Sequence, residues 1–208
     1  MQNLLGATSM TRRLGPALAL TLLLAACKGP PINSPLTGQS LYLCCNIHYE
    51  KPKINDTLYQ VGNLIPFGTR VQILEVRADS VVFQPEGHPA ITLVYEWGKK
   101  AGVPFDQYLD RLFVHDDPRA QFAPKPSPRG KSSAKGKAAP TTSTATLKLI
   151  ENAQVEQGMT RAEVLASLGP PPLHMTRTLD QNAWHYWHNR WSQYVVYFEG
   201  DRVARVGR

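Results

Sequence analysis

Residues 160–172 read Thr-Arg-Ala-Glu-Val-Leu-Ala-Ser-Leu-Gly-Pro-Pro-Pro, and this stretch decides the fold of the C-terminal part. The Thr160 hydroxyl and the Glu163 carboxylate are spaced to form a capping box, in which each accepts a hydrogen bond from the other residue's backbone amide. Gly169 suits the left-handed backbone that follows a helix, and the prolines after it prevent the helix from continuing. The spacing therefore predicts a helix over about 160–168.

The segments on either side complete a second, small domain over residues 147–208. Another short helix is expected before the helix at 160–168, because apolar residues recur between Leu147 and Val155. This pattern stops near Gly158. Aromatic and β-branched residues then predict three strands, 183–188, 193–198 and 203–206. We expect the two helices to cover one face of this three-stranded antiparallel sheet.

Residues 36–117 read as short strands followed by a helix. The strand candidates are 39–47, 57–61, 69–76, 80–84 and 90–96, separated by turns rich in Pro, Gly and Asp. Strands at this spacing favour a small antiparallel β-barrel-like domain. Apolar residues at positions 105, 108, 109, 112 and 113 predict an amphipathic helix that packs on its own domain, so the overall class is α+β.

Residues 118–146 differ in composition from both neighbours. They hold five prolines and six of the chain's 23 lysines and arginines, lack Asp and Glu, and have one large apolar side chain, Phe122. Such a segment cannot bury enough apolar area to offset its chain entropy. We predict a disordered basic linker that lets the C-terminal domain move independently. Because the net charge of +7 comes largely from this linker, neither folded part is expected to bind nucleic acid.

The N-terminus has the organisation of a bacterial export signal. Two arginines precede the uncharged apolar run 14–24, which is shorter than the ~20 residues of a membrane-spanning helix. Leu-Ala-Ala-Cys27 follows and resembles a lipobox, in which the cysteine thiol receives a diacylglyceryl group. We predict a signal peptide over 1–26, lipid attachment at Cys27, and a lipidated tether over 27–35 that leaves the protein on the outer membrane, facing the periplasm.

The other two cysteines, Cys44 and Cys45, are adjacent in a strand-like run. Three interpretations stay open: a vicinal disulfide, a bridge to another chain, or two thiols of which one points to the core and the other outward. His48 suggests a fourth interpretation, in which His48 activates Cys45 as a nucleophile, although no carboxylate that could orient His48 lies at a suitable spacing. His174, His185 and His188 do not make a metal site, because the last two face opposite sides of a strand. The sequence therefore predicts no catalytic residue, no metal and no cofactor.

The C-terminal pattern resembles the SmpA/OmlA domain, the family of the BamE lipoproteins. The residues that carry the resemblance are Gly158-Met159-Thr160, Val164, Leu168-Gly169-x-Pro171, Asn182-Ala183-Trp184-His185-Tyr186, Tyr194-x-Val196-Tyr197-Phe198 and Val203. The resemblance implies two helices on a three-stranded antiparallel sheet, and an outer-membrane lipoprotein that supports the insertion of β-barrel proteins. In the N-terminal part, residues 65–71 resemble the Pro-x-Gly-Thr-x-Val turn of bacterial Src-homology-3-like barrels.

These features predict a lipid-anchored periplasmic factor that binds an envelope protein as a scaffold and supports outer membrane protein assembly or envelope integrity. We expect no enzymatic activity and no small-molecule substrate, and the sequence does not identify the partner-binding residues. Three alternatives are an inhibitor of a periplasmic enzyme, a cell-wall-binding lipoprotein that uses the basic linker, and a thiol enzyme that uses Cys45 and His48.

Overall fold

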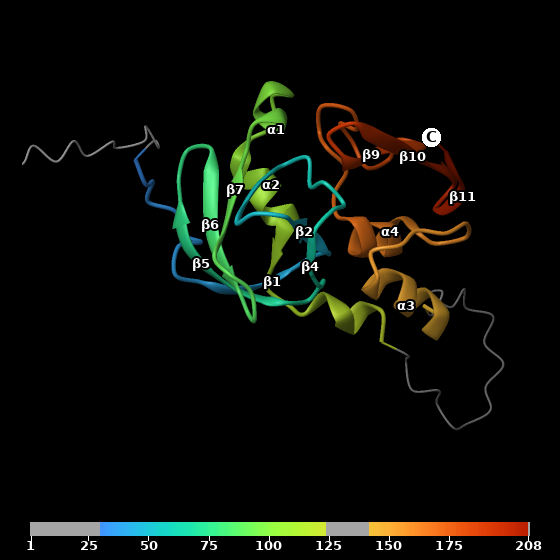
Figure 1. Cartoon of the computed structure of the whole chain (residues 1–208), viewed down its shortest axis with the longest axis horizontal. Helices are drawn as coiled ribbons and strands as arrows, with labels where there is room; N and C mark the ends of the chain where they lie inside the picture. Colours follow the sequence, from blue (N-terminus) through green and yellow to red (C-terminus); the bar gives the residue numbers. More distant parts are fainter. Residues whose placement is uncertain (1–29, 124–141, 208) are drawn as a thin grey trace, which may run out of the picture.

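A computed structural model describes residues 30–123 and 142–207, which form a mixed α+β structure (Figure 1). The N-terminal half contains a six-stranded sheet in the order β3-β7-β6-β5-β1-β8 and a two-stranded sheet of β2 and β4. Its strands are β1 (Ser40–Leu43), β2 (Ile47–Tyr49), β3 (Lys53–Asn55), β4 (Asn63–Ile65), β5 (Arg70–Val76), β6 (Ser80–Pro85), β7 (Ile91–Val94) and β8 (Phe113–Val114). Its helices are α1 (Trp97–Lys100), α2 (Phe105–Leu112) and the 3-10 turn Pro118–Gln121.

The N-terminal sheets do not close into a barrel, so the predicted small antiparallel barrel is corrected here. In the described residues β3 and β8 are the two ends of the larger sheet, and β3 pairs with β7 in parallel. The predicted strand 39–47 breaks after Leu43, and its two pieces, β1 and β2, join different sheets. Residues 57–61 do not form a strand, because Leu58 has a positive φ of 50°, which lies outside the β region.

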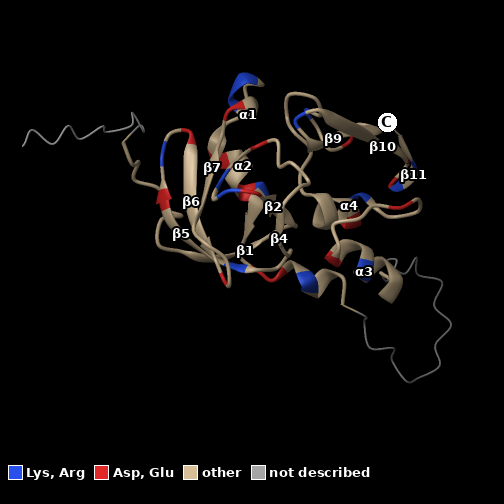
Figure 2. Ribbon diagram, viewed as in Figure 1, with Lys and Arg blue, Asp and Glu red and all other residues tan. Residues whose placement is uncertain are grey.

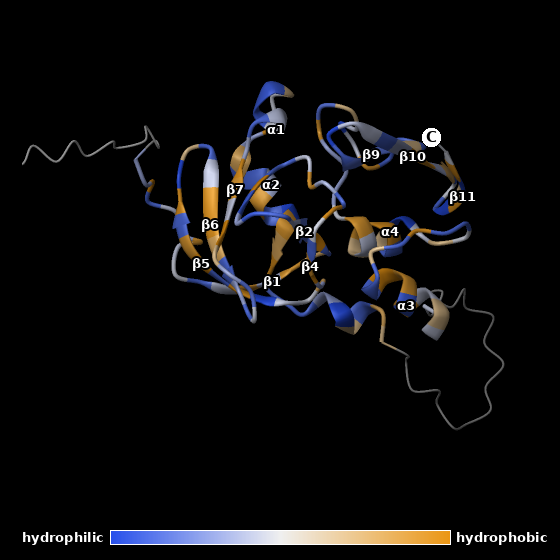
Figure 3. Ribbon diagram, in the orientation of Figure 1, coloured by the Kyte–Doolittle hydropathy of each residue, from blue (hydrophilic) through white to orange (hydrophobic). Residues whose placement is uncertain are grey.

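The predicted amphipathic helix is confirmed as α2. Its residues Tyr108, Leu109 and Leu112 are buried in the core of the N-terminal half, together with the alternate residues of β5 and β6. Figure 3 shows hydrophobic residues concentrated on these strands and on α2. This helix therefore packs on its own domain, as its spacing predicts.

The C-terminal half has the predicted arrangement of two helices and a three-stranded antiparallel sheet. Its elements are α3 (Thr144–Glu151), α4 (Arg161–Leu168), β9 (Ala183–Asn189), β10 (Ser192–Glu199) and β11 (Arg202–Gly207). The sheet order is β11-β10-β9, and both helices lie on one side of it (Figure 1). Trp184, Tyr186, Val196 and Phe198 are buried on that side, as the pleat alternation requires.

The capping box at the start of α4 is confirmed. The Glu163 amide donates to the Thr160 hydroxyl at 3.2 Å, and the Thr160 amide donates to the Glu163 carboxylate at 2.7 Å. At the other end, Gly169 has the expected positive φ of 79°, but its ψ of 178° is extended rather than left-handed helical. The chain therefore leaves α4 directly into the proline segment.

Replacing Thr160 by alanine is expected to lower the free energy of unfolding by about 1 kcal/mol, because the Glu163 amide loses its hydrogen-bond acceptor. Urea unfolding followed by circular dichroism measures the change. Thr144→Ala is the matched control, since Thr144 is exposed in the first turn of α3. Equal losses in the two variants would contradict a role for the capping box.

The two halves are in contact in the described residues, whereas the sequence predicts two separate domains joined by a linker. Phe67 and Phe122 lie in the hydrophobic core of the C-terminal half, with their ring centroids 5.9 Å apart, while Leu173 lies in the core of the N-terminal half. The predicted linker is also structured at both ends, because it begins with the 3-10 turn and the buried Phe122 and its last residues start α3. Residues 124–141 lie outside the described residues.

Candidate functional site

The lipidation residue predicted from the sequence, Cys27, lies outside the described residues, whereas Cys44 and Cys45 are described. They occupy the bend between β1 and β2 as free thiols, with their sulfur atoms 2.7 Å apart. Cys45 is fully buried and Cys44 is half-buried. Burial, followed by the hydrogen bond and the electrostatic effect of Cys44, raises the pKa of the Cys45 thiol well above its usual value. Cys45 therefore stays protonated at neutral pH.

Cys45 and His48, the residues of the thiol-enzyme alternative, have different surroundings in the structure. The partner of Cys45 is Cys44, and the Nδ1 atom of His48 is buried without a hydrogen-bond partner. Burial lowers the pKa of His48, and the positive charge of His188 lowers it further. Within residues 30–123 and 142–207, no group of three or more His, Cys, Asp or Glu side chains could hold a metal ion.

Asn46, next to the cysteine pair, joins the two halves. Its amide donates to the Ala166 carbonyl at 3.0 Å, and its side-chain nitrogen donates to the carbonyls of Ser167 and Ile150. Its side-chain oxygen accepts from the Phe67 amide at 2.8 Å. Asn46 is 1% exposed, so these bonds are made away from water. The buried carboxamide therefore fixes β2 to the end of α4.

A cluster of three tilted aromatic rings forms a second contact between the halves. His174 lies between Trp97 and Trp187, with ring centroid distances of 4.8 and 5.3 Å. Burial lowers the pKa of His174, and Lys100 lowers it further while Asp56 opposes the shift. The sequence does not predict this ring cluster, because the three residues come from α1, a loop and β9. His174 therefore contributes to the contact between the halves rather than to a metal site.

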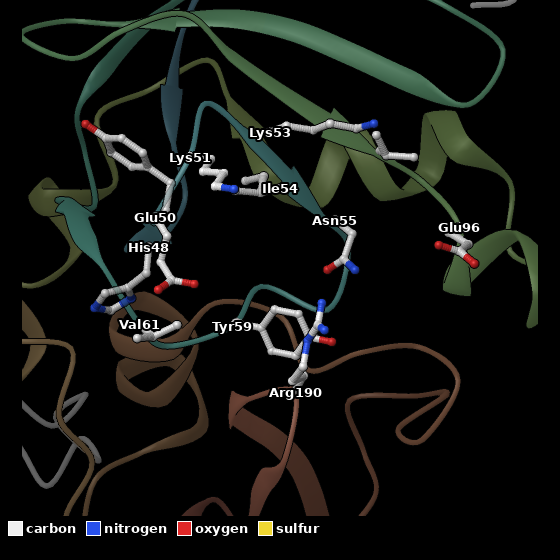
Figure 4. Close-up of a pocket in the computed structure, with 12 residues that line it drawn as sticks. His48, Glu50, Lys51, Lys53, Ile54, Asn55, Tyr59, Val61, Glu96 and Arg190 are labelled. Carbon is white, nitrogen blue, oxygen red and sulfur yellow. The ribbon is translucent and has the colours of Figure 1, made fainter. Parts of the chain in front are cut away.

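A cleft of about 510 Å³ opens where the two halves meet (Figure 4). The edge strand β3 lines one side, and Arg190, from the turn between β9 and β10, lies beside Tyr59 on the other. Lys51 and Lys53 add positive charge, and Glu50 and Glu96 add negative charge. The cleft can accept polar or extended ligands, but its lining includes no serine or cysteine nucleophile.

The outer sheet face, defined here by His185, Val195, Tyr197 and Arg205, is the side of the C-terminal sheet opposite α3 and α4. Cross-strand pairing places His185 opposite Val195 and Tyr197 opposite Arg205, and the Arg205 guanidinium lies 3.6 Å from the centre of the Tyr197 ring. These residues are half-buried or exposed. The turn from β9 to β10 adds Trp191, which is 88% exposed. An aromatic surface of this kind suits contact with another protein.

Two edges of the C-terminal sheet differ in how far they are covered. The β9 edge is occupied by the N-terminal half, because the Gln60 amide donates to the Trp187 carbonyl at 3.1 Å. The start of β11 is covered by Gly158 and Met159, which exchange backbone hydrogen bonds with Val203. Within residues 30–123 and 142–207, no strand pairs with the outer edge of β11, and Val206 near its end is 44% exposed.

The charges of the described elements support protein contact rather than binding to a polyanion. Figure 2 shows Lys and Arg interspersed with Asp and Glu over both halves. No helix in the described ranges is long and apolar enough to cross a lipid bilayer.

Comparison with protein families identifies the C-terminal half. A family model described as "Outer membrane protein assembly factor BamE domain" matches residues 150–207, from the end of α3 to the end of β11. Neither a search of curated proteins nor a search of solved structures found a match. The family match confirms the resemblance drawn from the capping box and the aromatic strands, and the matched range does not include the N-terminal half. Residues 150–207 of this chain are therefore a BamE domain.

Proposed function

We propose that this protein is an outer-membrane lipoprotein, anchored through Cys27, that binds an envelope protein and supports the assembly of outer membrane β-barrel proteins. The observation that carries the proposal is the BamE domain at residues 150–207, whose family description names outer membrane protein assembly. Within residues 150–207 the fold brings together no set of catalytic side chains, so we expect this domain to act by binding rather than by catalysis.

The outer sheet face is the surface through which we expect the partner to bind. The N-terminal half already occupies the side of α4 and the β9 edge through Asn46 and Gln60. Tyr197, Arg205 and the open end of β11 remain available. Tyrosine and arginine are frequent among the residues that dominate binding energy, and an open strand edge can pair with a strand of a partner.

Photo-crosslinking in the native host tests this proposal. A crosslinking amino acid at Tyr197 is expected to trap an envelope protein, whereas the same amino acid at Lys148 is not, because Lys148 is exposed on α3, away from the outer sheet face. Deletion of the gene is expected to lower the amount of folded β-barrel protein in the outer membrane, and a Tyr197→Glu variant is expected to restore it only in part.

Two outcomes would contradict the proposal. Adducts of equal intensity at Tyr197 and Lys148 would show that the outer sheet face is not a specific surface. Normal β-barrel levels in the deletion strain, together with no adduct at Tyr197, would remove the assembly role.

A further inference from the structure

The two adjacent cysteines are held in a position that favours a bond between them. Their sulfur atoms are 2.7 Å apart, against about 2.05 Å in a disulfide, so a bond needs a further approach of the two sulfurs and some strain in the backbone between the adjacent residues. The backbone around them is fixed on both sides, because the Cys44 amide donates to the Leu112 carbonyl and the Asn46 amide donates to the Ala166 carbonyl, both at 3.0 Å. The chain already bends at this pair, between β1 and β2.

The two thiols differ in their access to solvent. Cys44 is half-buried, whereas Cys45 is fully buried in the core of the N-terminal half. An external oxidant therefore reaches Cys44 first, and Cys45 is placed to react only with its neighbour. This arrangement of one accessible and one enclosed thiol is the arrangement that a two-step exchange requires.

We propose that Cys44 and Cys45 form a thiol-oxidation site that takes a disulfide as its co-substrate and closes to a reversible vicinal disulfide. The Cys44 thiolate attacks one sulfur of the external disulfide, forms a mixed disulfide and releases one thiol. The Cys45 sulfur then attacks the Cys44 sulfur while its proton passes to the leaving thiolate, which breaks the mixed disulfide and releases the second thiol. The pair loses two electrons and two protons, and the external disulfide gains both.

Oxidation at this site acts on the contact between the two halves. Cys45 directly precedes Asn46, whose side chain bonds the Ser167 carbonyl of α4 and the Phe67 amide. The Cys45 sulfur also lies close to the C-terminal half, because a Cβ atom added to Gly169 would be 3.4 Å from it. A ring that closes at residues 44 and 45 restricts the backbone that presents Asn46. The oxidised protein is therefore the form with the more rigid contact to the BamE domain.

Oxidation by glutathione disulfide tests the proposal on full-length protein that carries Cys27→Ser, which leaves Cys44 and Cys45 as its two thiols. Intact-mass spectrometry is expected to show the loss of two hydrogen atoms per chain, with no retained glutathione and no thiol left to alkylate. The Cys45→Ser variant is expected to retain one glutathione on Cys44, and the Cys44→Ser variant to retain none. Hydrogen exchange at the Asn46 amide is expected to be slower in the oxidised protein.

Three results would overturn the proposal. The first is two alkylatable thiols after oxidation, the second is a stable glutathione adduct on the parent protein, and the third is a disulfide-linked dimer. Equal exchange at Asn46 in both redox forms would remove the effect on the contact between the halves. The experiment uses purified protein, so its result is independent of the proposed assembly role.

Discussion

Asn46→Ala is expected to lower the free energy of unfolding by about 3 kcal/mol. The carboxamide is buried and bonds the Ser167 carbonyl at 3.0 Å and the Phe67 amide at 2.8 Å. Alanine leaves these buried groups without their partner, at a cost of roughly 1–3 kcal/mol each. Urea unfolding measured by tryptophan fluorescence reports the change, because Trp184 and Trp187 lie in the BamE domain.

Asn152→Ala is the matched control for this substitution. Asn152 is also an asparagine that bonds a backbone carbonyl, that of Lys148, but it is exposed at the end of α3. Water replaces its hydrogen bond, so we expect a loss of less than about 1 kcal/mol. A loss at Asn46 no larger than that at Asn152 would show that the two halves are not held together by this residue.

The BamE domain could be predicted closely because its signals are local. Thr160 and Glu163 are three residues apart, and Gly169 and the prolines follow within the same segment, so the helix and its ends can be identified from a short window. The alternation of Trp184 and Tyr186 gives the buried face of β9 in the same way. Short-range hydrogen bonds and side-chain alternation depend little on the rest of the chain.

The arrangement of the N-terminal strands cannot be predicted from the sequence, because alternation does not say which strand pairs with which. β3 follows β2 in the chain, yet it pairs in parallel with β7, and β1 and β2 separate at the cysteine pair into different sheets. Closure into a barrel would have required β3 and β8 to pair. The strand pattern alone therefore favours a barrel that the tertiary structure does not form.

The contact between the halves was missed for the same physical reason. The hydrogen bonds of Asn46 reach residues 104 and 121 positions along the chain, and an asparagine in a strand-like run gives no sign of such partners. Phe122 is the one contact residue with a sequence signal, because a single large apolar residue in a basic, proline-rich stretch indicates a packed position. The average composition of residues 118–146 hides this signal.

Cys27→Ser is expected to move the protein from the membrane fraction almost entirely to the soluble periplasmic fraction. The apolar run 14–24 and the Leu-Ala-Ala-Cys27 sequence direct the proposed lipidation, and each buried CH₂ of an acyl chain contributes about 0.8 kcal/mol to membrane binding. Two or more chains hold a protein on the bilayer stably, and serine cannot form the thioether that attaches them. Fractionation of cells followed by immunoblotting measures the distribution.

Cys44→Ser is the control for this experiment, because it removes a thiol from the folded part and leaves the lipobox intact. We expect it to remain in the membrane fraction. If Cys27→Ser also remained there after a high-salt wash, the lipid anchor would be wrong, and membrane association would have to come from a protein partner. The outer sheet face would then both recognise the partner and hold the protein at the membrane. A Tyr197→Glu substitution in the Cys27→Ser protein would then release the protein from the membrane fraction.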